Sequence, residues 1–190
     1  MCSNGNSGQE GYLMTRKAVP GTPLPAIRVC CDMPGFIADW RRCDHLSNFL
    51  AEAFNLVKAD PFAFSNMLST IINEVLETIF YHNTGKGSLI LQLTEENAIT
   101  VLRAEFSADE RIRSLYEEIV ATLTAHDPVA LYEQLLFQAS SVDTRDICLY
   151  EIAADYGARL TVENGSKSGS ICLAVHICLN SCLKSEIGNN

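Results

Sequence analysis

At the centre of the chain lies the stretch Ser69-Thr70-Ile71-Ile72-Asn73-Glu74-Val75-Leu76-Glu77-Thr78. Its apolar residues recur three and four positions apart, which indicates a helix with one apolar face and one polar stripe. Asp60-Pro61 predicts where this helix starts, because aspartate can cap free N–H groups and proline suits the first helical position. The helix should end between His82 and Gly85. Its polar stripe comprises Thr70, Asn73, Glu74, Glu77, Thr78 and Tyr81.

Two apolar runs after this helix predict a β-hairpin. Gly87–Leu93 and Ala98–Phe106 are separated by Glu95-Glu96-Asn97, which has the composition of a turn, so the two strands should pair antiparallel. Three helix-start signals follow along the chain: the capping box Ser107-Ala108-Asp109-Glu110, then Asp127-Pro128 with a helix through Phe137, then Asp143 or Thr144.

The last part of the chain predicts a second hairpin. Gly157 stands where a left-handed helix cap would need it, and Arg159–Val162 and Ser170–Leu179 should be strands joined by the Asn164–Gly169 turn. In the final strand, alternate residues face opposite ways: Ile171, Leu173, Val175 and Ile177 on one side, Cys172, Ala174, His176 and Cys178 on the other.

Before the central helix, Ala26–Cys31 alternates as a strand does, and Pro34-Gly35 is expected to end it. An amphipathic helix should follow from Phe36, interrupted near Cys43. Strands joined by short turns favour an α+β fold, a two-layer sandwich with helices on one face of a mixed, mostly antiparallel sheet. We expect a flexible leader and extended segment over residues 1–25, one domain over 26–179 and a tail over 180–190.

The composition limits the classes of partner. The chain is 47% hydrophobic and 19% charged, which is typical of a globular protein, and its 23 acidic and 14 basic residues give a net charge of −9. This charge repels phosphate backbones and anionic lipid, so neither nucleic acid nor membrane is an expected partner. The sequence lacks a secretory signal and a membrane-spanning stretch, and its eight cysteines indicate free thiols in a reducing, cytoplasmic compartment.

The central stretch resembles the N-box of the GHKL superfamily, the histidine-kinase-like ATPases of the Bergerat fold. Further similarity comes from Ala38-Asp39-Trp40-Arg41-Arg42, Ala125-His126-Asp127-Pro128 and Ile152-Ala153-Ala154-Asp155-Tyr156-Gly157-Ala158-Arg159-Leu160, which occur in the order of a branch of stand-alone bacterial regulators. This branch resembles SiaB-type and anti-sigma-factor kinases. The resemblance implies signal transduction, in a two-component or partner-switching pathway, with a response regulator or a STAS-domain protein as partner.

The same resemblance implies a nucleotide site on the central helix. Glu74 matches the carboxylate that acts as general base, and Thr78 stands four residues later, where the family has an asparagine that ligates Mg²⁺. Asn73, Glu77, His82 and Arg145 are the other candidate residues for binding ATP or ADP with Mg²⁺. Both members of the Glu74–Thr78 pair should point into a cleft between helices and sheet.

Three departures from the family pattern weaken this expectation. Thr78 lacks a carbonyl oxygen, no Asp-x-Gly-x-Gly box occurs between Leu93 and Asp143, and Asp143-Thr144-Arg145-Asp146 replaces a glycine-rich box with two carboxylates that repel phosphate. The leading hypothesis is therefore a regulator that acts by binding a signalling protein, with weakened or lost ATP turnover. An active ATP-dependent serine/threonine kinase is the alternative.

Other interpretations of these residues stay open. The polar stripe could be the solvated side of the helix, and His82 could serve as a cap at a helix end. His176 and Cys178 with Cys182 invite a zinc interpretation, but without a Cys-x-x-Cys pair these residues are expected to fill the core, and no zinc is expected. A structural dimerisation module is a further alternative if the apolar C-terminal strand lies at the edge of the sheet, and a homodimer is left open.

Overall fold

The computed structural model of the protein describes residues 27–55, 61–83, 85–97, 99–137 and 147–178. Its elements, in chain order, are β1 (Ile27–Asp32), α1 (Met33–Ile37), α2 (Arg41–Asn55), α3 (Pro61–His82), β2 (Ser88–Glu96), β3 (Ile99–Ser107), α4 (Glu110–Ala125), α5 (Pro128–Phe137), α6 (Ile147–Tyr156), β4 (Arg159–Asn164) and β5 (Ser170–Ile177). The predictions of the long central helix, of both hairpins and of the helix from Pro128 are confirmed.

The five strands form one sheet in the order β1-β2-β3-β5-β4. All four pairings between the described strands are antiparallel, so the expected mostly antiparallel sheet is confirmed, without the parallel pair that a mixed sheet would contain. β5 lies between β3 and β4, so the condition on which the dimerisation alternative depended, a C-terminal strand at the edge of the sheet, is not met. The long connection through α4, α5 and α6 places β4 at the edge of the sheet, with room for one strand between it and β3. The short turn after β4 then brings β5 into this position, where it pairs with both β3 and β4.

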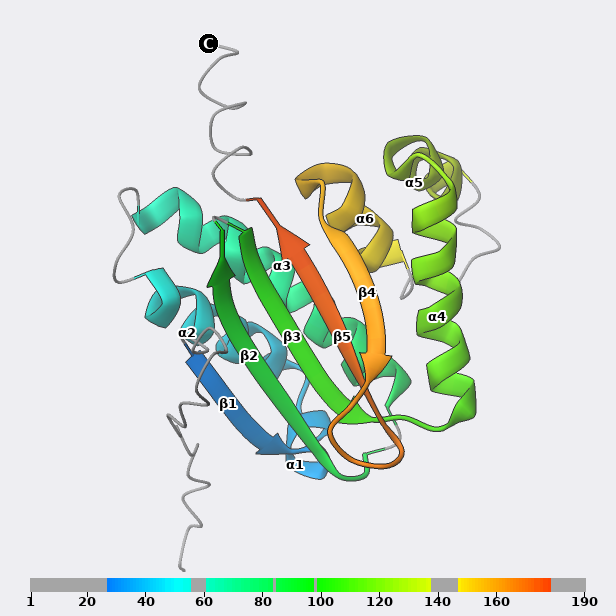
Figure 1. Cartoon of the computed structure of the whole chain (residues 1–190). Helices are drawn as coiled ribbons and strands as arrows, with labels where there is room; N and C mark the ends of the chain where they lie inside the picture. Colours follow the sequence, from blue (N-terminus) through cyan, green and yellow to red (C-terminus); the bar gives the residue numbers. More distant parts are fainter. Residues whose placement is uncertain (1–26, 56–60, 84, 98, 138–146, 179–190) are drawn as a thin grey trace, which may run out of the picture.

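The helices cover one face of this sheet, as predicted. Figure 1 shows α2, α3 and α6 behind the sheet and α4 beside the edge strand β4. Alternation along each strand places apolar residues on the helix side, where one row across the sheet consists of Val29, Leu91, Ala104 and Leu173, each at most 1% exposed. The predicted division of β5 into two faces is also confirmed: Ile171, Leu173, Val175 and Ile177 are all completely buried.

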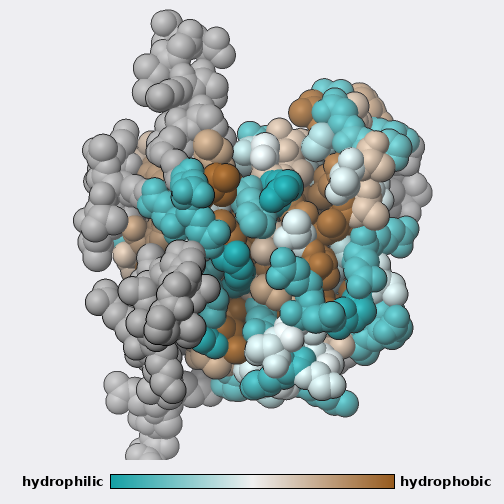
Figure 2. Space-filling model, in the orientation of Figure 1, coloured by the Kyte–Doolittle hydropathy of each residue, from teal (hydrophilic) through white to brown (hydrophobic). Residues whose placement is uncertain are grey.

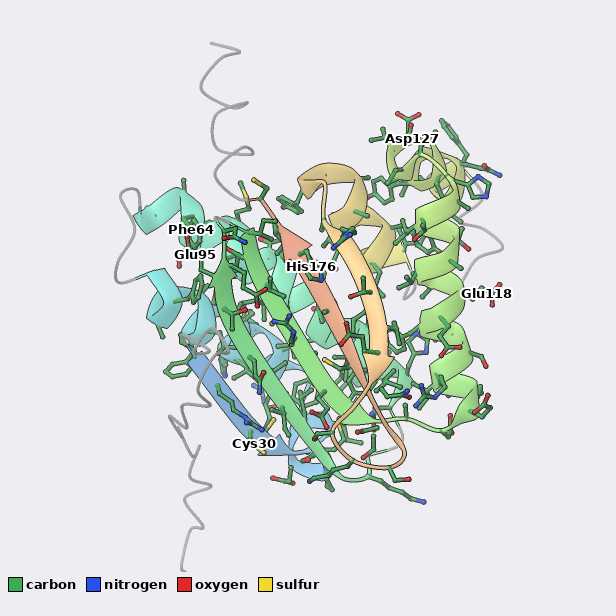
Figure 3. All side chains as sticks on the ribbon, in the orientation of Figure 1. Cys30, Phe64, Glu95, Glu118, Asp127 and His176 are labelled. Atoms are coloured by element: carbon green, nitrogen blue, oxygen red, sulfur yellow. The ribbon has the colours of Figure 1, made fainter. Side chains whose placement is uncertain are left out.

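The opposite face of the sheet carries polar side chains. One row across it pairs Arg28 with Gln92, Gln92 with Arg103 and Arg103 with Ala174. Figure 2 shows this side of the molecule, where hydrophilic residues are spread over the sheet with hydrophobic ones between them. Cys30 and His176 belong to the same face (Figure 3).

Three local expectations need correction. Pro34-Gly35 lies inside α1, because the Asp32 carboxylate caps this helix by accepting a hydrogen bond of 2.7 Å from the N–H of Gly35. The next helix starts at Arg41 and continues through Cys43 without interruption. The cap of α4 is Asp109, not Ser107, which is the last residue of β3.

The central helix α3 lies in the middle of the hydrophobic core. Its residues Leu68, Ile71, Ile72, Val75, Leu76 and Ile79 are fully buried, as the apolar face predicted. None of the described helices has both the length and the hydropathy needed to cross a lipid bilayer. The predicted helix start at Asp143 or Thr144 and the ends of the predicted domain lie outside the described residues.

Candidate functional site

The polar stripe of α3 points into the protein around its middle. Thr78 is completely buried, and its hydroxyl donates a hydrogen bond of 2.8 Å to the backbone carbonyl of Glu74. The Nδ2 atom of Asn73 donates to Oε1 of Glu77 at 2.9 Å. Asn73, Glu74 and Glu77 are half-buried, so the interpretation of the stripe as a solvated helix face does not hold for these residues.

Glu74 faces α6 across the interface between the two helices. Its carboxylate accepts a hydrogen bond from the thiol of Cys148, which lies in the first turn of α6. Burial raises the pKa of Glu74, and the negative charges of Glu151 and Glu77 raise it further, while the bond from Cys148 acts in the opposite direction. A carboxyl in this environment holds its proton to a higher pH than an exposed glutamate does.

Two thiols border the same group of carboxylates. Burial, followed by the charge of Glu77, raises the pKa of Cys43 to about 12. Burial and the bond to Glu74 raise the pKa of Cys148 to about 12 as well. Both cysteines are therefore neutral at physiological pH and act as small apolar side chains with a weak donor.

Tyr132 of α5 hydrogen-bonds to Glu151 of α6, which also acts on Glu74. Burial raises the pKa of Tyr132, and the charges of Glu151, Asp155 and Cys148 add to this effect. We call Glu74, Glu77, Glu151 and Asp155 the acidic cluster. It links α3 to α6, and Tyr132 links it to α5.

The acidic cluster is poorly suited to hold phosphate. The ranges of α3, α5 and α6 contain no lysine or arginine, so within these described helices no cation offsets its carboxylates. Phosphate groups need positive charge or free backbone N–H groups, and carboxylates repel them. Among the described residues, no group of three histidine, cysteine, aspartate or glutamate side chains is placed to hold a metal ion.

The remaining candidate residues lie apart from one another or outside the described chain. His82 is the last residue of α3, one turn beyond Thr78, and is half-buried. Arg145 falls outside the described residues. His176 lies on the open face of the sheet, where burial and the charges of Arg159 and Arg103 lower its pKa.

Sequence analysis missed the partners of Glu74 on the neighbouring helices. Cys148 and Glu151 are three positions apart in the sequence, so a helix places them on one face, and that spacing was the available signal. Which face of α6 turns towards α3 depends on tertiary packing, and the local pattern does not carry that information. Tyr132 was part of the predicted helix from Pro128 but had no feature that separated it from its neighbours.

We compared the chain with protein-family models, with curated proteins and with solved structures, and none of the three comparisons gave a match.

Proposed function

We propose that this protein is a bacterial signalling regulator with a histidine-kinase-like ATPase fold. It acts by binding another signalling protein, a response regulator or a STAS-domain protein, in a two-component or partner-switching pathway. Its ATP turnover is weakened or lost. The support for this proposal is the arrangement around Glu74 and Thr78, together with the sequence resemblance of α3 to the N-box.

Glu74 and Thr78 have partners within the protein, whereas the buried Oδ1 atom of Asn73 has no hydrogen-bond partner in the described structure. The Thr78 hydroxyl is bonded to the Glu74 carbonyl, and the Glu74 carboxylate accepts from Cys148. Coordination of Mg²⁺ by Thr78 would require this buried hydroxyl to leave its bond and reach a solvated ion. The acidic cluster would at the same time repel the phosphates that Mg²⁺ has to neutralise.

Calorimetric titration of the full chain with ATP, with and without Mg²⁺, and an assay for released phosphate together test the loss of turnover. We expect no binding below about 1 mM nucleotide, because the described part of the site offers carboxylates where cations are needed. Tight, Mg²⁺-dependent binding accompanied by release of phosphate from ATP would contradict the proposal. A parallel titration of Glu74→Gln shows whether this carboxylate prevents nucleotide binding. If it does, removing its charge should make weak binding of ATP detectable.

Affinity purification of the full chain from its native bacterium tests the regulatory role. We expect a response regulator or a STAS-domain protein to be enriched, and addition of ATP to leave the enrichment unchanged. Enrichment of neither class would contradict the proposal.

One observation favours the second candidate, an active serine/threonine kinase. A general base works best when its pKa approaches the working pH, and burial raises the pKa of Glu74 in that direction. In this mechanism the Glu74 carboxylate takes the proton of a serine or threonine hydroxyl, the hydroxyl oxygen bonds to the γ-phosphorus of ATP, and ADP leaves. Transfer of labelled phosphate to a partner protein, abolished by Glu74→Gln, would establish it.

A further inference from the structure

Helix α5 is apolar on the side that faces the solvent as well as on the side that faces the protein. None of its ten residues is buried. Pro128, Leu131, Tyr132 and Leu135 are the less exposed residues and turn towards the body of the protein. On the outer side, Val129 is 48%, Leu136 49% and Phe137 91% exposed.

These outer residues form one continuous surface. Val129, Glu133, Leu136 and Phe137 follow the spacing i, i+4, i+7 and i+8, which places them on one helix face. We call this set the α5 outer face. Because Val129, Leu136 and Phe137 leave apolar surface in water, the α5 outer face is suited to a contact that the described residues do not make.

Among the described residues, the charged side chains on and directly beside this face are negative. Glu133 lies within it and Asp127 directly precedes the helix, while Glu151 and Asp155 add negative charge on α6, against the inner side of α5. Figure 3 shows Asp127 at the end of α5 that meets α4. Because the ranges of α5 and α6 contain no lysine or arginine, an occupant of this surface gains by carrying positive charge.

A hollow beside the α5 outer face could receive a side chain of the occupant. It has a volume of about 360 Å³ and lies between the end of α4 and the first turns of α5. Its lining residues are Thr122, His126, Asp127, Ala130, Leu131 and Gln134. The hollow combines the apolar side chains of Ala130 and Leu131 with polar groups and the carboxylate of Asp127, a chemistry that fits the aliphatic stem and cationic head of lysine or arginine.

We infer that the α5 outer face is a docking surface for an amphipathic helical segment of a partner protein, with apolar residues along its contact and lysine or arginine at its flanks. The inference rests on the proposed function, since it names the surface and the chemistry of the partner that the regulator binds. The apolar side chains supply the binding free energy, and the carboxylates select a basic segment over an acidic one.

Binding of two synthetic helical peptides to the full chain tests this inference. Both peptides have about 14 residues and the same leucine face, and they differ only in flanks of lysine or of glutamate. Fluorescence anisotropy should show that the lysine peptide binds at least about 10-fold more tightly than the glutamate peptide, by a margin that shrinks with added salt. Equal binding of the two peptides, or no binding, overturns the inference.

Matched variants on α5 and α2 locate the contact. Phe137→Ser and Glu133→Lys should each lower the affinity for the lysine peptide by about 10-fold or more. Phe49→Ser and Glu52→Lys make the same chemical changes at exposed positions of α2, on another part of the molecule, and should leave binding unchanged. If the α5 variants and the α2 variants lower the affinity for the lysine peptide equally, the peptide is attracted by the negative charge of the chain in general, and the inference is overturned.

The same variants separate this inference from the proposed function and from self-association. If a signalling protein purified with the chain binds Phe137→Ser as tightly as the unchanged protein, the proposed function stands and the docking surface is wrong. If no signalling protein is found, the proposed function fails, while the peptide series still decides whether the surface takes a basic helix. A dimer in sedimentation that Phe137→Ser dissociates would assign the surface to a second copy and overturn the inference.

Discussion

At the scale of single residues, Glu74 shows the unfavourable effect of placing several carboxylates together, because its ionised form is disfavoured. Burial and the charges of Glu151 and Glu77 raise its pKa above the ordinary 4.5, so the folded protein holds the proton more tightly than the unfolded chain. The free energy of unfolding is therefore reduced as the pH rises from 4.5 through the folded pKa of this group.

We predict that Glu74→Gln stabilises the protein at pH 7, because glutamine keeps the shape and removes the charge. The gain should be less than about 1 kcal/mol, since Glu74 is partly exposed and water screens its interactions. Urea denaturation at about pH 7 and about pH 4 measures it, and the gain should vanish at the lower pH, where the wild-type carboxyl is protonated. As a control, Glu118→Gln changes an exposed residue of α4 (Figure 3) and should have little effect at either pH. A gain that persists at low pH would contradict the charge explanation.

The cysteines should differ in reactivity. Burial raises the pKa of Cys43 and Cys148 to about 12, so the reactive thiolate is scarce at neutral pH, whereas Cys30 is exposed on the open face of the sheet. We predict that iodoacetamide modifies Cys30 in minutes and leaves Cys43 and Cys148 unmodified until the protein is unfolded. Peptide mapping by mass spectrometry identifies each site. Rapid modification of Cys148 in the folded protein would contradict its burial against Glu74.

At the scale of one element, α4 depends on its first turn. The Asp109 carboxylate accepts a hydrogen bond of 2.9 Å from the N–H of Ile112, and its charge faces the positive end of the helix. We predict that Asp109→Ala lowers the free energy of unfolding by about 1 kcal/mol and that Asp109→Asn, which keeps the acceptor, lowers it by less. Thermal unfolding by circular dichroism distinguishes the two. Equal losses would show that charge, and not the cap bond, stabilises this end.

The elements that sequence predicted well are those whose signal is local. β5 has a large aliphatic residue at every second position from Ile171 to Ile177, and α3 combines a proline start with a strict apolar face. Pro34-Gly35 was misinterpreted because a proline in the first turn is as compatible with a helix as with a turn, and the capping bond from Asp32 decides between them. The place of β5 in the sheet depends on pairing over long distances in the chain, which no local pattern reports.

The candidate site was predictable to the same degree. The spacing of Glu74 and Thr78 on one helix correctly placed them on neighbouring positions of one face. It did not show that Thr78 would be completely buried, nor that Glu74 would meet a thiol of α6. These facts follow from how α3 packs between α2, the sheet and α6, and the contacts between helices involve side chains from separate parts of the chain.

At the scale of the whole molecule, large apolar residues occur both in the buried core and on the α5 outer face, but only those in the core stabilise the fold. Leu173 occupies β5 in the interior of the sheet and is completely buried, whereas Leu136 on α5 is 49% exposed. Burial of a leucine stabilises the fold through transfer from water and close packing, and a leucine left in water contributes little. Comparing the two positions therefore separates residues that hold the fold together from residues that remain available for a contact.

We predict that Leu173→Ala lowers the free energy of unfolding by about 2–5 kcal/mol, while Leu136→Ala changes it by less than about 0.5 kcal/mol. Urea denaturation of both variants measures the difference, with one cooperative transition expected for each because the core spans the sheet and its helices. A large cost for Leu136→Ala would mean that the outer side of α5 is packed within the protein in solution. That outcome would remove the exposed apolar surface on which docking of a basic helix depends, even if the rest of the fold were unchanged.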